Sequence, residues 1–203
     1  MKDNNYIDVI TSKLDNIADD DLKNAIIKLV DERNRLIETL NIDPLTGIYN
    51  RRILDHIREY TSVVICDIDN FKEFNDKSGH QVGDLILQLV AKTLVDNCRC
   101  NDFVCRYGGD EFLLVFCGAD EDTVIKRMND VSKSLTDTFI CSKKPVTLSI
   151  GISSYKNGCT LSEIISEADK ALYLSKHDGK NTITCYNEIQ SENNSLKIKK
   201  ITK

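Results

Sequence analysis

The residues with the clearest chemical potential are Gly108-Gly109-Asp110-Glu111, where two glycines are followed at once by two carboxylates. Val104 precedes this run and the apolar segment 112–116 follows it, which predicts two short buried strands joined by a tight turn. Glycine tolerates a positive φ and lets a backbone or a phosphate approach closely. Adjacent carboxylates are costly to bury unless a positive charge joins them, and a hard divalent cation prefers oxygen ligands. The pattern therefore predicts a cation site at the start of the second strand.

A second acidic position lies upstream, where the continuous apolar run 62–66 ends in Asp67-Ile68-Asp69. Such a run is typical of a buried strand, in which Asp67 and Asp69 share one face because side chains alternate. If this strand end lies beside the glycine turn, Asp67 joins Asp110 and Glu111 in one carboxylate cluster. A cluster of this kind suits Mg²⁺ bound to a triphosphate, because Mg²⁺ combines a few carboxylates with substrate oxygens. Asp69 has an alternative structural role, as a cap of the helical turn that follows.

The chain resembles the GGDEF family, the catalytic module of diguanylate cyclases, whose name spells residues 108–112. A lone Gly-Gly-Asp-Glu is also compatible with a hairpin that has a charged rim, but further segments match in family order over about residues 43–186. These segments are 43–51, 67–76, 79–84, 168–173 and 176–181.

The resemblance implies an enzyme, a nucleotidyltransferase that condenses two GTP into cyclic di-GMP and releases two pyrophosphates. It implies Mg²⁺ as cofactor, with Mn²⁺ as a substitute, and a homodimer, since each subunit contributes half of the reacting pair. The alternative is a catalytically degenerate GGDEF module that binds GTP or cyclic di-GMP as a sensor. The retained glycines and carboxylates favour the enzyme.

The resemblance also assigns site residues. Asp67, the carbonyl of Ile68, Asp110 and Glu111 are expected to bind metal, and Asp110 matches the position given a base role. Lys72 is expected to stabilise charge during phosphoryl transfer, although lysines are more often simply exposed. For His80, a role at the start of a helix is an equal alternative. The expected substrate-binding residues are Asn75, His80, Asp84, Gly108, Gly109, Lys176 and Lys180.

Arg99 and Asp102 form an R-x-x-D pattern just before the glycine turn, where the family places a product-binding inhibitory site. An arginine can bind phosphate or stack on guanine, and a carboxylate can accept from the guanine edge. The alternative is a surface ion pair. Arg127 is named as a candidate for the other half of this site.

The pattern of residues divides the chain into three parts. Residues 1–42 predict a first helix, a break at Asp19-Asp20-Asp21 and a second helix with near-heptad apolar spacing. This segment is either a dimerising stalk or an amphipathic helix packed on its own domain. Residues 43–186 form the expected catalytic domain, and 187–203 a basic, disordered tail. The apolar residues of the second helix are Leu22, Ile26, Leu29, Leu36 and Leu40, with Arg33 as the polar exception.

Alternating helical and strand patterns predict an α+β domain with helices covering a mostly antiparallel sheet. The resemblance narrows this to the palm-like arrangement of nucleotidyl cyclases and polymerases. The expected helical segments are 51–60, 70–77, 82–97, 120–138 and 161–176, and the expected strands are 62–67, 103–107, 111–117, 145–153 and 182–186.

Bulk properties exclude several classes of protein. The net charge of −5 argues against a nucleic-acid binder, which needs a basic surface. No run approaches the roughly 18 apolar residues of a membrane span. The N-terminus lacks the apolar core of a signal peptide, so we expect a cytoplasmic protein.

Overall fold

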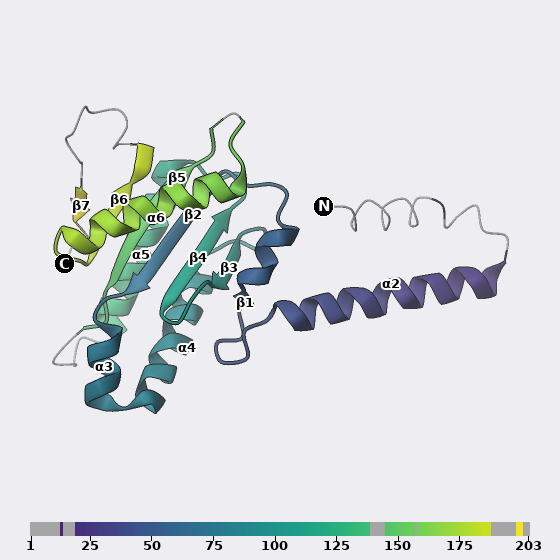
Figure 1. Ribbon diagram of the computed structural model, residues 1–203, viewed down its shortest axis with the longest axis horizontal. Helices are drawn as coiled ribbons and strands as arrows, with labels where there is room; N and C mark the ends of the chain where they lie inside the picture. The colour runs from purple at the N-terminus through teal and green to yellow at the C-terminus, as the bar shows by residue number, and fades with distance from the viewer. Residues whose placement is uncertain (1–12, 14–18, 139–144, 157, 188–197, 201–203) are drawn as a thin grey trace. The chain divides into compact units, whose positions relative to one another are not determined.

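A computed structural model of the chain describes residues 13, 19–138, 145–156, 158–187 and 198–200 (Figure 1). The chain divides into two compact units, residues 1–42 and residues 43–203. No helix in these described ranges is both long enough and apolar enough to cross a membrane.

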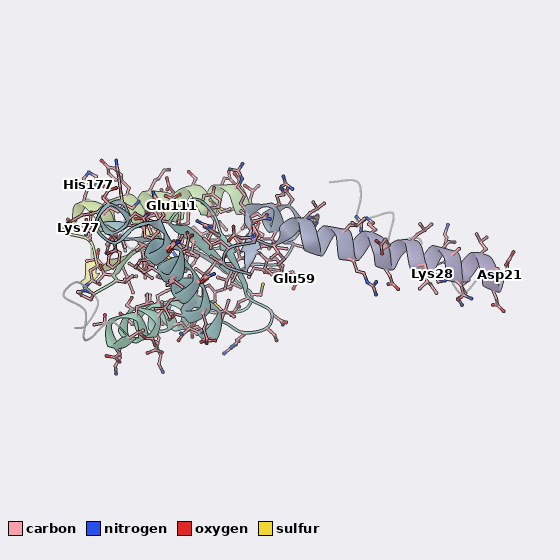
Figure 2. All side chains as sticks on the ribbon, turned by 90° about the horizontal axis from the view of Figure 1, so that it is seen from below. Asp21, Lys28, Glu59, Lys77, Glu111 and His177 are labelled. Atoms are coloured by element: carbon pink, nitrogen blue, oxygen red, sulfur yellow. The ribbon has the colours of Figure 1, made fainter. Side chains whose placement is uncertain are left out.

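The first unit contains the helix α2, Asp20–Asn41. It begins where the sequence predicts, because the Asp19 carboxylate accepts hydrogen bonds from the backbone nitrogens of Asp21 and Leu22 at 3.0 and 3.1 Å. Charged side chains such as Asp21 and Lys28 project from the helix (Figure 2). The predicted helix before Asp19 lies outside the described residues.

The apolar side chains of α2 form a stripe with heptad spacing. We call Leu22, Ile26, Leu29, Leu36 and Leu40 the leucine stripe; Leu29 is 71% exposed and Leu40 is 58% exposed. Exposed apolar side chains in this spacing are typical of a helix that packs against another helix.

The described part of the second unit is built on a seven-stranded sheet with the order β1-β3-β4-β2-β5-β6-β7. Strands β3, β4, β2 and β5 pair antiparallel in succession, and β1–β3 and β5–β6 are parallel pairs. The sheet is therefore mostly antiparallel, as predicted. The strands are β1 Tyr49–Asn50, β2 Ser62–Ile68, β3 Phe103–Arg106, β4 Glu111–Phe116, β5 Leu148–Ser154, β6 Thr182–Cys185 and β7 Ile198–Lys200.

Helices cover both faces of this sheet (Figure 1). On one face α4 and α5 pack on alternate residues of the central strands, such as Val64 and Leu114. On the other face α6 and the short helix η2 pack on the intervening residues, such as Ile65 and Leu113. The helices are η2 Arg51–His56, α3 Phe71–Ser78, α4 His80–Asp96, α5 Glu121–Thr138 and α6 Leu161–His177.

Gly151 on β5 lets α6 lie directly on the sheet. A Cβ atom there would be 2.2 Å from the Ala168 carbonyl oxygen and 2.3 Å from the Leu172 nitrogen, distances that only glycine avoids. Ser175 fixes the end of the helix, because its Oγ bonds the Ile150 carbonyl and the Thr184 hydroxyl, each at 2.7 Å. The packing on Gly151 and the hydrogen bonds of Ser175 lie within about two turns of Lys176. They therefore fix the backbone from which this lysine extends.

Every helix and strand predicted between residues 62 and 186 is present, with ends that differ by three residues or fewer. The helix predicted over 51–60 is instead a 3-10 helix that ends at His56, and Asn50 caps its start. Strand β1 was not predicted, because two residues carry no periodic pattern.

The prediction of a disordered tail over 187–203 is wrong for Ile198–Lys200. These residues form β7, which pairs antiparallel with β6 along Thr182–Thr184. Without β7 the edge of β6 would present unpaired backbone groups, and even a basic segment can satisfy them with its own backbone. Residues 188–197 and 201–203 lie outside the described part of the chain.

Candidate active site

Asp67 and Glu111 lie directly opposite each other on the neighbouring antiparallel strands β2 and β4. Opposed residues share one face of a sheet, with Cβ atoms about 5 Å apart. Because side chains alternate, this is the face of Ile65 and Leu113, on which α6 packs. Asp110 lies at the same end of β2, because the backbone nitrogen of Ile68 donates to the Asp110 carbonyl at 3.3 Å.

A lysine from α6 completes this acidic corner. Lys176 Nζ is 2.8 Å from Asp67 Oδ2, and the two side chains are 34% and 14% exposed. Burial raises the pKa of the Asp67 carboxyl against the lowering effect of Lys176, and the charges of Asp110 and Glu111 raise it further. Partial burial opposes the charged form of Lys176, but the bond and charge of Asp67 outweigh it and raise the pKa of Lys176.

The expected convergence of the carboxylates is only partly found. Asp67, Asp110 and Glu111 lie close enough for their charges to interact, yet the described residues include no three acidic, histidine or cysteine side chains arranged to hold a cation. Lys176 is bound to Asp67 instead. The donor set nevertheless fits Mg²⁺, because three carboxylates and the nearby Ile68 carbonyl are the oxygen ligands that this cation prefers.

The glycine turn differs from its prediction. Neither Gly108 nor Gly109 has a positive φ, so the backbone conformation does not demand glycine at either position. At Gly108 a Cβ atom would be 2.8 Å from Glu111 Oε2, the end of a flexible side chain, so an added Cβ would require this carboxylate to move. The turn is closed by the Glu111 carbonyl, which accepts from the nitrogens of Tyr107 and Gly108 at 2.8 and 3.2 Å. Gly108 thus gives the Glu111 carboxylate its room.

Arg106 holds this turn from outside, a role that the sequence analysis missed. Its Nε and Nη2 donate to the Gly109 carbonyl at 3.1 and 2.7 Å, and its Nη1 pairs with Asp43 Oδ2 at 3.3 Å. The Asp43 carboxylate also accepts from the nitrogen and hydroxyl of Thr46. Burial opposes the charge of Asp43, but these bonds and Arg106 together lower the pKa of its carboxyl. The position of an arginine two residues before the glycine pair was the sequence signal that could have indicated this role.

The expected base-recognition residues lie on α3 and α4. Asn75 packs against the first turn of α4 so closely that a Cβ atom on Gly83 would be 1.8 Å from Asn75 Oδ1. This Oδ1 atom is buried and has no hydrogen-bond partner among the described residues. Such an acceptor is costly in isolation, and a bound donor would satisfy it. Asp84 follows Gly83 and is exposed, as are His80 and Lys72.

Lys180 lies in the turn after α6, with its Nζ 2.7 Å from the neutral Asn70 Oδ1. Asp69 fixes this turn, because its carboxylate accepts from the Asn181 nitrogen and from the hydroxyls of Thr147 and Ser149 at 2.6 to 2.9 Å. Asp69 is therefore structural, but it does not cap α3: the cap position is Asn70, with no side-chain cap bond. The structure brings Lys180 to the turn after β2, the strand that carries Asp67.

Asp102 faces the protein interior, which does not fit the expected contact with guanine. Its carboxylate is 1% exposed, binds Arg127 Nη1 at 2.7 Å and accepts from the Arg99 and Cys117 nitrogens. The Arg127 guanidinium also lies over Phe116. Asp102 thus anchors the loop before β3 through a buried ion pair with Arg127 of α5. The spacing of residues in the sequence does not reveal this pair. The Arg99 side chain is exposed.

Residues 40–182 match a family model described as diguanylate cyclase, GGDEF domain. The chain belongs to the GGDEF family. The matched range of the GGDEF domain contains every candidate site residue named above, from Asp67 to Lys180.

Known GGDEF proteins resemble the chain over most of its length. Diguanylate cyclase DosC of Escherichia coli strain K12 is 32% identical over 182 residues, which cover 80% of this chain and 40% of that protein. The chain thus spans less than half of this relative.

Solved GGDEF structures share the fold. The coiled coil and GGDEF domain of DgcB from Caulobacter crescentus, in complex with c-di-GMP, has a TM-score of 0.69 at 26% identity and covers 81% of this chain and 95% of that one. Diguanylate cyclase SiaD from Pseudomonas aeruginosa, in complex with its activator SiaC, has a TM-score of 0.70 at 26% identity. The match covers 90% of this chain and 75% of the SiaD chain. The palm-like α+β fold expected from the resemblance is confirmed.

Proposed function

We propose that this GGDEF domain is an active diguanylate cyclase, which condenses two GTP into cyclic di-GMP with Mg²⁺ or Mn²⁺ as cofactor. The observation that carries the proposal is the opposition of Asp67 and Glu111 on β2 and β4, with Asp110 beside them and Lys176 bound to Asp67. Family membership supports the same reaction.

In this reaction the 3′ oxygen of each GTP forms a bond to the α-phosphorus of the other. The bond from that phosphorus to the bridging oxygen breaks, pyrophosphate leaves, and the 3′ hydroxyl loses its proton. A bound Mg²⁺ neutralises phosphate charge and lowers the pKa of the attacking hydroxyl. Asp67, Glu111, Asp110 and the Ile68 carbonyl are the residues that would hold it.

The remaining residues position the nucleotide. Asp110 lies at the turn and is suited to accept the hydroxyl proton, while Lys72, Lys176 and Lys180 offer ammonium groups to the phosphates. Gly108 and Gly109 let the phosphates approach the turn. The Asn75 amide and the Asp84 carboxylate together match the edge of guanine, which offers both donors and acceptors. His80 begins α4 close to this pair.

A homodimer is part of the proposal, because one domain binds one GTP and the bond forms between two. The leucine stripe of α2 supports pairing of two chains, since its four leucines are exposed along the helix. We also propose that cyclic di-GMP inhibits the enzyme through the exposed Arg99. Asp102 would act in this site by positioning the loop.

Incubation of the protein with GTP and MgCl₂, followed by mass analysis of the products, tests the proposal. We expect cyclic di-GMP and two pyrophosphates from the wild type, none from Glu111→Gln, and wild-type yield from Asp130→Asn, an exposed carboxylate on α5. If the wild type binds GTP or cyclic di-GMP and yields no product, the domain is a binding module without turnover.

A further inference from the structure

The contact between Lys176 and Asp67 places a cationic side chain on a carboxylate of the proposed cation site. We infer that Lys176 is the internal counter-ion of the acidic corner, and that a divalent cation binds by exchange with its ammonium group. The inference rests on the proposed function for the identity of the cation and substrate. The ion pair itself is a feature of this chain.

Charge explains why a counter-ion is needed. Asp67 is largely buried, and the charges of Asp110 and Glu111 act on it from the same strand ends. Three neighbouring carboxylates destabilise one another unless a cation offsets them. The ammonium of Lys176 offsets this repulsion, so a metal ion must replace an interaction that the protein already makes. Lys176 therefore weakens cation binding in the absence of nucleotide.

Packing determines how the exchange takes place. The backbone of α6 is held near Lys176 by Gly151 and by both hydrogen bonds of Ser175. The helix therefore cannot withdraw easily, and the lysine must leave Asp67 by rotating its flexible four-carbon side chain. Once released, its ammonium is free to bind phosphate oxygens. Cation binding and triphosphate binding are thereby coupled through one side chain, and each favours the other.

Lys180 provides a matched comparison. It also carries an ammonium group, in the turn after α6, but its partner is the neutral oxygen of Asn70. Substitution of Lys180 removes one positive charge from the expected phosphate site and leaves the bond between Lys176 and Asp67 in place. An effect on cation affinity that is specific to Lys176 therefore reports the ion pair and not the general loss of charge.

The test measures Mn²⁺ binding without nucleotide, by electron paramagnetic resonance and by the Mn²⁺-induced rise in Tm. We expect Lys176→Met and Lys176→Gln to unfold at lower temperature than the wild type without Mn²⁺, and to bind Mn²⁺ with a Kd lower by about five- to tenfold. Mn²⁺ should raise their Tm more than that of the wild type. Lys180→Met should keep a Kd within about twofold of the wild type, and Asp67→Asn combined with Lys176→Gln should lose the gain.

An unchanged or higher Kd in both folded Lys176 variants would overturn the inference, as would an equal gain in Lys180→Met. Absence of measurable Mn²⁺ binding in every variant would overturn it as well. If the Lys176 variants bind Mn²⁺ more tightly while the wild type makes no cyclic di-GMP, the counter-ion role stands and the proposed enzymatic function fails.

Discussion

Gly151 and Leu172 approach so closely that the backbone of α6 rests on the backbone of β5, with 2.3 Å between an ideal Gly151 Cβ and the Leu172 nitrogen. The contact lies about one turn before Lys176, a residue of the proposed site, on the same helix. The position of that lysine over Asp67 thus depends on a residue that touches neither side chain.

We expect Gly151→Ala to displace α6 from the sheet, since backbone atoms cannot move aside as a flexible side chain does. Overpacking of this kind costs about 1–3 kcal/mol, and the displaced Lys176 should lower cyclase activity as well. Urea unfolding and GTP turnover measure the two effects. Gly109→Ala is the control for stability, because its Cβ would meet nothing within 4 Å and its φ is not positive. Equal stability of the two variants would contradict the close packing.

The pair of Arg106 and Asp43 should stabilise the domain in a pH-dependent way. The folded state lowers the pKa of Asp43, so its contribution is present above the unfolded pKa of about 3.9 and is lost as the pH falls through the lower folded value. Asp43→Asn should therefore be less stable than the wild type at pH 7, and the difference should shrink toward pH 3. Urea unfolding at both pH values measures it, and a constant difference would argue against the carboxylate charge.

Arg99 and Asp102 should separate into a ligand contact and a structural anchor. Asp102→Ala leaves the largely buried Arg127 without its partner, so we expect a loss of about 3 kcal/mol, measured by urea unfolding. Asp96→Ala, which removes an exposed ion pair with Lys92, should cost less than about 0.5 kcal/mol. A loss as small in Asp102→Ala would show that the buried pair does not anchor the loop.

Arg99→Ala should behave differently, because Asp102 bonds the backbone nitrogen of Arg99, which the substitution keeps. We expect unchanged stability and a GTP turnover that no longer slows as cyclic di-GMP accumulates. Progress curves with added product provide the measurement. Slowing equal to that of the wild type would remove Arg99 from the proposed inhibitory site.

The leucine stripe should control the proposed dimer. Leu29→Glu places a charge in the stripe, and we expect its specific activity at low protein concentration to fall by about tenfold or more as dimers dissociate. Asn24→Glu adds the same charge at an exposed position of α2 outside the stripe, so it should behave like the wild type.

Activity and sedimentation over a dilution series measure this effect. A Leu29→Glu protein that stays dimeric and active at every concentration would show that other surfaces hold the two chains together.

The sequence predicted most of the elements because their signals are local. The buried strand 62–68 shows as a continuous apolar run, and Asp19 caps a helix that begins directly after it. Matched family positions also pointed to Asp67 and Glu111, which the strand register then placed side by side. These features depend on neighbours in the chain or on one strand pair.

The features that the sequence did not predict depend on contacts between distant segments. Lys176 lies far from Asp67 along the chain, and only the packing of α6 on the sheet brings them together. Asp102 reads as a surface residue until α5 supplies Arg127. The closeness of Glu111 Oε2 to position 108 likewise arises from the orientation of the Glu111 side chain, while the φ of Gly108 is not positive.

Asp69 accepts hydrogen bonds from the start of β5 and from the turn after α6, while it follows directly on the strand of Asp67. One carboxylate thereby connects the end of β2, the start of β5 and the turn after α6. A disturbance at Thr147, immediately before β5, should consequently be transmitted toward Lys180, because Asp69 bonds both Thr147 and the backbone of Asn181, the residue after Lys180.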